Sequence, residues 1–169
     1  MPVTIRPELP ADISAIHALT EAAFRTAPHT SHTEQFIVNA LRQAGALHLS
    51  LVAQDAGAVV GHVGVSPVAV SGGAPRWYGL APLSVAPDRQ RQGMGALLVM
   101  EALRQLKDGA AAGCVLLGDP AYYARFGFRP VPGLVLEGVP PEYFQALAFS
   151  AAAMPQGSVS FHAAFNATR

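Results

Sequence analysis

Cysteine and charge are both scarce in this sequence. The 169 residues include one cysteine, Cys114, which excludes an internal disulfide and a metal site built from several cysteines. Charged residues make up 13%, and 11 acidic residues balance 11 lysines and arginines, so the formal net charge at pH 7 is zero. This balance argues against a protein whose main role is to bind nucleic acid or an anionic membrane. A local basic cluster could still bind a small anion.

Long apolar runs are also missing. No segment reaches the ~18 apolar residues of a membrane-spanning helix, and residues 1–6 lack the charged head and apolar stretch of a signal peptide. Hydrophobic residues nevertheless make up 51% of the sequence, which excludes a disordered chain. A domain of this size buries roughly 68–70% of the surface that its unfolded chain exposes. We therefore expect a soluble, cytoplasmic protein with a single domain over residues 1–169.

Hydrophobic periodicity predicts a mixture of strands and helices. Helices are expected after the cap residue Asp12, at a capping box of Ser31 and Glu34, over 95–106 and at Asp119. The expected strands are 4–6, 47–51, 59–70, 77–86, 114–117, 128–131, 144–149 and 159–165. This order predicts an α/β (α+β mixed) fold, with a central mixed, mostly antiparallel sheet and helices on both faces.

The most informative segment is 85–98, where a strand ends in a tight turn and a helix follows. The first N–H groups of a helix have no intrahelical acceptor, and the helix dipole adds partial positive charge there. Gly93 and Gly95 let an anion approach the backbone, and Arg89 and Arg91 stand beside them. The pattern favours a phosphate-binding site. The alternatives are tight packing of the helix for the glycines and solvated surface positions for the arginines.

Other familiar sites do not fit the sequence. A P-loop needs Gly-Lys-Ser/Thr, which is absent, and a dinucleotide-binding fold needs a third glycine where Leu98 stands. Cys114 lies within an apolar run, which favours a small buried hydrophobic residue over a nucleophile. The six histidines show no pair at metal-binding spacing on a helix, so we expect no metal.

Two motifs carry a resemblance to a known family. Residues 90–95 read Gln-x-x-Gly-x-Gly after a strand that ends Val-x-Pro, and this arrangement resembles the acyl-CoA pyrophosphate loop of the GNAT N-acetyltransferase superfamily. Residues 122–128, Tyr-Tyr-Ala-Arg-Phe-Gly-Phe, are similar to the family's second signature. The stretch around them also resembles a bacterial YhbS-like acetyltransferase branch. The resemblance covers about residues 3–150, and 157–166 looks like an added strand.

The resemblance implies the GNAT-like acyl-CoA N-acyltransferase fold, with acetyl-CoA (coenzyme A) as co-substrate and no metal. In the family, the pantetheine arm lies where two strands separate. Pro82 fits this position, because it cannot donate a ladder hydrogen bond and we expect the ladder to break there. By position, the resemblance implies three groups of acetyl-CoA-binding residues. Leu83, Ser84 and Val85 bind the pantetheine amides, and Tyr123 lies at the thiol end. The residues around the pyrophosphate are Arg89, Gln90, Arg91, Gln92, Gly93, Met94, Gly95 and Ala96.

The resemblance also implies direct attack of a neutral amine on the thioester. It places the Val85 N–H at the oxyanion and Tyr123 as the general acid; the alternative for Tyr123 is packing without a proton role. Many relatives carry a glutamate on the corresponding strand, whereas 78–86 contains no acidic residue. His62, acting through water, and Glu34 are candidate bases. Their alternatives are a polar histidine on a strand and closure of the capping box.

The sequence thus favours an N-acetyltransferase that moves an acetyl group from acetyl-CoA to a primary amine. The acceptor, a small metabolite or a protein amino group, stays open, as does the acyl group. A non-catalytic acyl-CoA-binding sensor or regulatory module is the alternative, and the missing strand glutamate counts for it. We expect neither nucleic acid nor a membrane as a partner. Family analogy makes the late strands a candidate homodimer interface.

Overall fold

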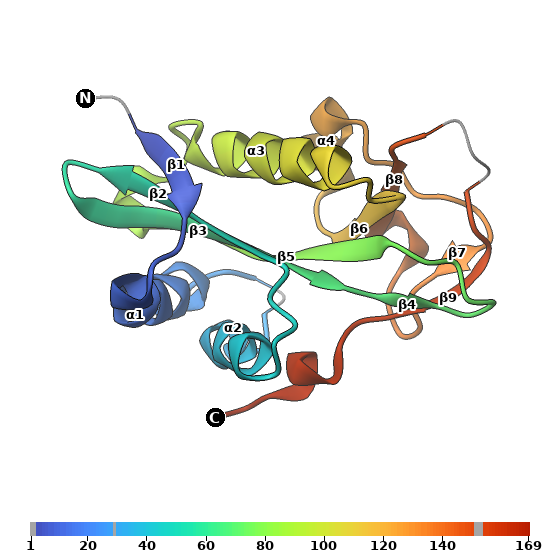
Figure 1. The fold of residues 1–169 in the computed structure, drawn as a ribbon, viewed down its shortest axis with the longest axis horizontal. Coiled ribbons are helices and arrows are strands. Elements are labelled where there is room, and N and C mark those ends of the chain that lie inside the picture. Colours follow the sequence, from blue (N-terminus) through green and yellow to red (C-terminus); the bar gives the residue numbers. More distant parts are fainter. Residues whose placement is uncertain (1–2, 29, 151–153) are drawn as a thin grey trace. The chain divides into compact units, whose positions relative to one another are not determined.

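A computed structural model describes residues 3–28, 30–150 and 154–169 (Figure 1). This part of the chain divides into two compact units. The first comprises the residues up to Ser66 together with Ala81–Ala102 and Ala163–Arg169, and the second comprises Pro67–Leu80 and Leu103–His162. Strand β5 (Trp77–Val85) and helix α3 (Met94–Asp108) pass from one unit into the other.

The first unit is built on antiparallel strands in the order β1-β2-β3, with β5 beside β3. Their bounds are β1 Thr4–Pro7, β2 Leu49–Asp55 and β3 Ala58–Pro67. Val52 pairs with His62, and Ala53 pairs with Gly61. Because successive side chains point to opposite faces of a sheet, Val52 and His62 share one face, and Ala53 and Gly61 share the other.

Helices cover both faces of this sheet (Figure 1). Helices α1 (Ile13–Phe24) and α2 (Glu34–Gln43) pack on the Val52 face, where Ile16 of α1, Val38 of α2 and Val52 form one buried cluster. On the other face, a Cβ placed on Gly61 would lie 3.0 Å from Leu98 Cδ1 of α3. The missing side chain at Gly61 therefore lets α3 pack closely on the strand.

In the second unit, one strand pairs with a parallel neighbour on one side and with an antiparallel neighbour on the other. Strand β6 (Gly113–Leu117) runs parallel to β5 from Trp77↔Gly113 to Gly79↔Val115, and antiparallel to β8 (Phe144–Ala148). Cys114 is fully buried, as its apolar run predicts, and burial raises the pKa of its thiol. A smaller sheet has the order β4-β9-β7, with bounds Ala69–Val70, Gly157–Ser160 and Leu134–Val135.

The ladder next to Pro82 breaks as expected. The β5–β6 pairing ends at Gly79↔Val115, whereas β5 itself continues to Val85. Beyond the break, β5 stays against β3, since a Cβ placed on Gly64 would lie 3.2 Å from the Ala81 carbonyl oxygen. After Gly79, β5 therefore keeps β3 as its neighbour but is no longer paired with β6.

Several predicted element bounds are wrong. Residues 128–131 form a single bridge, Arg129↔Ala146, because Pro130 has no N–H to extend a ladder. The strand expected over 157–166 ends at Ser160, and a 3-10 helix follows at Ala163–Asn166. The run 59–70 divides into β3 and β4.

Two predicted helix caps are also wrong. Helix α2 begins at Glu34 after Thr33, not at Ser31, and Thr33 makes no side-chain cap hydrogen bond. The Asp12 carboxylate does not cap α1. It instead accepts hydrogen bonds from the Leu9 N–H, at 2.7 Å, and from the Arg6 guanidinium.

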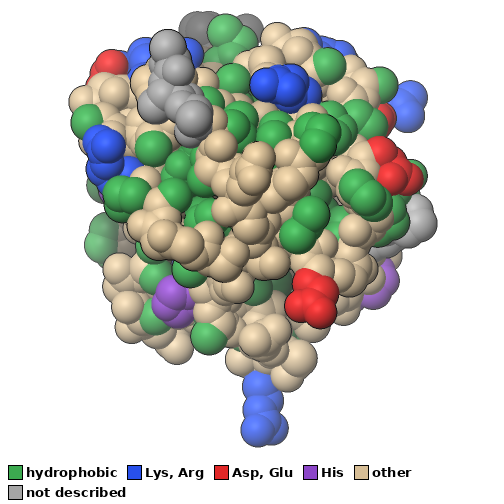
Figure 2. Space-filling view, turned by 90° about the vertical axis from the view of Figure 1, so that its right-hand side faces the viewer, with side chains coloured by type: hydrophobic (Ala, Val, Ile, Leu, Met, Phe, Trp, Pro, Cys, Tyr) green, Lys and Arg blue, Asp and Glu red, His purple; other side chains and the backbone are tan. Residues whose placement is uncertain are grey.

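Charged side chains are thinly spread over the surface drawn in Figure 2. On this face the described Lys, Arg, Asp and Glu side chains lie scattered among hydrophobic and uncharged groups. Lys107, the single lysine of the sequence, lies near the end of α3, with its ammonium 5.6 Å from the centre of the Phe149 ring. Over the described ranges, no helix is both long and apolar enough to cross a bilayer.

Candidate active site

The turn between β5 and α3 has the backbone geometry of an anion-binding loop. A 3-10 turn at Pro87–Arg89 follows β5, and α3 begins at Met94. Gly93 has a φ of +87°, which is the left-handed region that favours glycine, and nothing lies within 4 Å of where its Cβ would be. Packing therefore does not explain Gly93, because its missing side chain faces open space. Arg91 is also left-handed, with a φ of +64°.

The first turn of α3 supplies backbone donors beside this opening. The Leu97 N–H donates to the Gly93 carbonyl oxygen at 3.1 Å. The N–H groups of Met94, Gly95 and Ala96 precede it, so helix geometry leaves them without an intrahelical acceptor. Together with the positive end of the helix dipole, these groups favour an anion at the exposed Gly93.

The two loop arginines differ in their surroundings. An Arg89 guanidinium nitrogen lies 2.5 Å from Asp55 Oδ2 at the end of β2, and this hydrogen bond raises the pKa of Arg89. Arg89 therefore ties the loop to the sheet, whereas Arg91 is exposed. The Gln90 amide also braces the loop, because its Nε2 donates to the Val85 carbonyl oxygen at 3.2 Å. Sequence reasoning missed Asp55, since the pair is 34 residues apart.

The end of β5 contains a buried hydroxyl. Ser84 is 1% exposed, and its Oγ has no hydrogen-bond partner among the described residues. Leu83 and Val85 on either side are half-buried. Because a buried polar group without a partner is unfavourable by about 1–3 kcal/mol, this position is suited to a ligand or water that bonds Ser84.

Tyr123 lies in the second unit, at the end of the short helix α4 (Pro120–Tyr123). The predicted cap is confirmed, because Asp119 Oδ1 accepts the Ala121 N–H at 2.9 Å. The half-buried Tyr123 ring has edge contacts with Tyr122 and Phe128, at centroid distances of 4.9 and 6.1 Å. Burial raises the pKa of Tyr123 to about 12, so its phenol is protonated at neutral pH.

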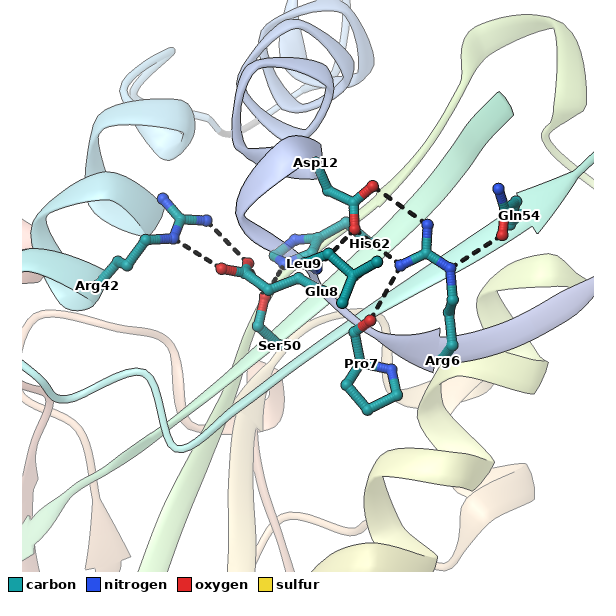
Figure 3. A network of polar contacts seen from close by, with 9 residues as sticks. All are labelled: Arg6, Pro7, Glu8, Leu9, Asp12, Arg42, Ser50, Gln54 and His62. Carbon is teal, nitrogen blue, oxygen red and sulfur yellow. Dashed lines mark hydrogen bonds and ion pairs between the residues drawn. The ribbon is translucent and has the colours of Figure 1, made fainter. Parts of the chain in front are cut away.

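His62 belongs to a polar network on the sheet face that α1 and α2 cover (Figure 3). It is fully buried, and its Nε2 is 2.8 Å from Ser50 Oγ. Ser50 Oγ in turn donates to Glu8 Oε1, and the Arg42 guanidinium donates to both Glu8 oxygens at 2.8 and 2.9 Å. The network links Glu8, which directly follows β1, with α2, β2 and β3 through groups far apart in the sequence.

The hydrogen bonds assign the tautomer of His62. Ser50 has one hydroxyl proton and gives it to Glu8, so the imidazole Nε2 must carry the proton shared with Ser50. Nδ1 is then a bare acceptor, and it has no partner among the described groups. Burial lowers the pKa of His62 to about 4, although the charge of Glu8 opposes this. Burial alone would raise the pKa of Glu8, but hydrogen bonds from Arg42 and Ser50 outweigh it and lower that pKa.

Glu34 is held by the turn before α2 and does not complete a capping box. Its Oε2 accepts a hydrogen bond from Thr30 Oγ at 2.5 Å and another from Ser31 Oγ at 3.5 Å. Its Oε1 is buried and has no partner among the described residues. The candidate bases His62 and Glu34 both belong to the first unit, as do the loop residues 83–96.

Metal-binding side chains do not gather in this protein as far as the structure describes it. Within 3–28, 30–150 and 154–169, no three His, Cys, Asp or Glu side chains are placed to hold a metal ion.

Comparison with known proteins places this geometry in a family. Residues 46–130, which include the loop and the Tyr122–Phe128 motif, match the acetyltransferase (GNAT) domain. The chain is 44% identical over 126 residues to the uncharacterized N-acetyltransferase YhbS of Escherichia coli (strain K12), covering 74% of this chain and 72% of that protein.

Solved structures agree with the sequence comparison. A GNAT family acetyltransferase from Brucella melitensis in complex with acetyl-CoA is 48% identical, with a TM-score of 0.87 over 98% of this chain and 99% of that one. YhbS from Escherichia coli in complex with CoA is 36% identical, with a TM-score of 0.86 over 98% of this chain and 92% of that one. The expected α+β fold, a mixed sheet with helices, is confirmed. The chain belongs to the GNAT acetyltransferase family.

Proposed function

We propose that this protein is an N-acetyltransferase that transfers the acetyl group of acetyl-CoA to a primary amine. The acceptor is a small metabolite or a protein amino group. The observation that carries the proposal is the loop at Gly93, whose left-handed backbone leaves an open, donor-rich helix start. Acetyl-CoA and CoA occur in the complexes of two solved relatives that are 48% and 36% identical.

In this proposal the pyrophosphate rests on the backbone N–H groups of Arg91 to Ala96. Gln92, Gly93, Met94 and Gly95 are its firmest contacts, with Gln90 and Arg89 as braces of the loop. The pantetheine amides bond to Leu83, Ser84 and Val85 of β5, and the partnerless Ser84 Oγ supports a ligand at that strand.

The amine nitrogen attacks the thioester carbon, and the oxyanion accepts a hydrogen bond from the Val85 N–H. When the tetrahedral intermediate collapses, the C–S bond breaks and the acetyl group stays on nitrogen. Tyr123 donates to the leaving sulfur and supplies the proton that the thiolate takes up. The phenol is protonated at neutral pH, as a donor must be, but burial raises its pKa to about 12 and so makes it a weaker acid than an ordinary tyrosine. After the transfer, the phenolate regains its proton from water.

Neither candidate base gains support from its surroundings. His62 has no exposed surface, and its low pKa makes it a weak base. Glu34 is hydrogen-bonded to Thr30 and Ser31 within its own turn. The amine therefore loses its proton to water in this proposal. The absence of an acidic residue from 78–86 also favours a second candidate, a non-catalytic acyl-CoA-binding module.

The test is thermal unfolding with acetyl-CoA, followed by turnover with a panel of small amines and lysine-containing peptides. Acetyl-CoA at 100 times its Kd is expected to stabilise the fold by roughly 2.7 kcal/mol. Binding with CoA release and an acetylated amine supports the enzyme. Binding without any turnover supports the non-catalytic module, and no stabilisation at millimolar acetyl-CoA contradicts both.

Removal of the Tyr123 hydroxyl tests the acid directly. We expect Tyr123→Phe to lower kcat well over tenfold, because a positioned acid contributes about 10²–10⁴-fold. The affinity for acetyl-CoA should stay the same, since the loop and β5 are untouched. Steady-state kinetics with a calorimetric Kd measures both quantities, and an unchanged kcat would remove the acid role.

A further inference from the structure

Gly118, the residue after β6, is held at both of its backbone polar groups. Its N–H donates to the Tyr143 carbonyl oxygen at 3.0 Å, and its carbonyl oxygen accepts Gln145 Nε2 at 3.0 Å. Tyr143 directly precedes β8, and Gln145 lies on it. The segment after β6 is therefore fixed to the neighbouring strand through one residue.

The Tyr123 ring occupies the space where a side chain of residue 118 would be. A Cβ placed on Gly118 would overlap Tyr123 Cε2 and lie 2.8 Å from Cδ2. Gly118 does not have the left-handed backbone that Gly127, with a φ of +96°, adopts nearby. The contact with the ring, and not the local backbone conformation, therefore requires glycine at this position.

A glutamine side chain is energetically unfavourable at the buried position of Gln145 unless its amide makes a needed hydrogen bond. It is fully buried opposite Leu116, and its Oε1 has no partner among the described residues. An apolar residue would avoid an unsatisfied acceptor worth about 1–3 kcal/mol. The sheet does not depend on this amide, because β6 and β8 already pair from Gly113↔Ala148 to Leu117↔Phe144.

We propose that Gly118 and Gln145 are positioning residues that orient the Tyr123 phenol for the reaction. Gln145 holds the Gly118 carbonyl, the bare Gly118 backbone supports one part of the ring, and Phe126 and Phe128 contact the ring at centroid distances of 6.2 and 6.1 Å. The inference rests on the proposed acid role of Tyr123. It adds two residues that do not themselves touch the reacting atoms.

A double-mutant cycle separates positioning from general damage. Gly118→Ala is expected to lower kcat at least tenfold and Gln145→Met about threefold to tenfold, with the KM for acetyl-CoA within twofold. In the Tyr123→Phe background both changes should alter kcat by less than twofold, because the hydroxyl they position is gone. Losses of equal size in both backgrounds would overturn the inference. Gly109→Ala is the matched control, since Gly109 has no left-handed φ and its Cβ would lie 3.3 Å from its nearest neighbour.

A second readout does not depend on activity. Absorbance at alkaline pH, with the Tyr123→Phe spectrum as reference, follows ionisation of the Tyr123 phenol. Gly118→Ala should displace the ring toward solvent and lower its pKa from about 12 toward the usual value near 10. An unchanged titration would overturn the inference. If the titration shifts but Tyr123→Phe keeps full activity, the acid role fails while the placement of the ring by Gly118 stands.

Discussion

Gly93→Glu is expected to abolish stabilisation by acetyl-CoA. The substitution forces a side chain into a backbone with a φ of +87° and places a carboxylate where we propose the pyrophosphate binds. The expected loss of affinity is on the order of 100-fold, about 2.7 kcal/mol of binding free energy, so acetyl-CoA at 100 times the wild-type Kd would stabilise the variant by only about 0.4 kcal/mol. Thermal unfolding across an acetyl-CoA titration measures it.

The chain offers a closely matched control for this change. Gly73 has a φ of +86°, and nothing lies within 4 Å of its Cβ position, so Gly73→Glu adds the same charge and similar backbone strain in a hairpin turn. It should lower stability without altering the response to acetyl-CoA. If both variants, or neither, lose that response, the loop at Gly93 is not the pyrophosphate site.

Mild acid is expected to destabilise the protein through His62. The pKa of this histidine is about 4 in the folded protein and 6.5 in the ordinary state, so the unfolded chain binds its proton first. The resulting stability is complete above pH 6.5 and is lost as the pH falls toward 4, by about 3 kcal/mol in all. Urea unfolding at a series of pH values measures this slope. Ser50, Glu8 and Arg42 are the polar groups that face the ring from the surrounding elements.

His62→Gln isolates this contribution. The glutamine amide can donate to Ser50 as Nε2–H does, but it does not titrate, so the pH dependence between 6.5 and 4.5 should flatten. His32→Asn is the control, because His32 is exposed and its left-handed backbone accommodates asparagine. Parallel pH curves for wild type and His62→Gln would show that another group causes the acid sensitivity.

Sequence patterns predicted the features that depend on local chemistry. The break at Pro82 and the cap at Asp119 follow from properties of single residues, and the loop at Gly93 follows from neighbouring ones. Asp12 was misassigned because Arg6 and the Leu9 N–H compete for its carboxylate. Such competition depends on which groups the fold brings together.

The contacts that the sequence patterns did not predict all join residues that are distant in the sequence. Asp55 pairs with Arg89, and Gln145 bonds Gly118 27 residues away. No periodicity links such pairs, because side-chain contacts between strands and loops are set by the packed fold. A signal for Gly118 does exist in the sequence, because a glycine directly after a buried strand and near an aromatic pair is consistent with close approach of a ring.

Lys107, the single lysine of the sequence, lies over the Phe149 ring, and its being the single lysine has a practical consequence for the search for an acceptor. Because no other residue of this chain carries a side-chain primary amine, acetylation of this protein on a lysine side chain can occur only at Lys107. Lys107→Arg keeps a cation over the ring and gives a protein without lysine. With that variant, any acetyl-lysine detected in a mixture of this protein and cell proteins comes from the proteins offered as acceptors.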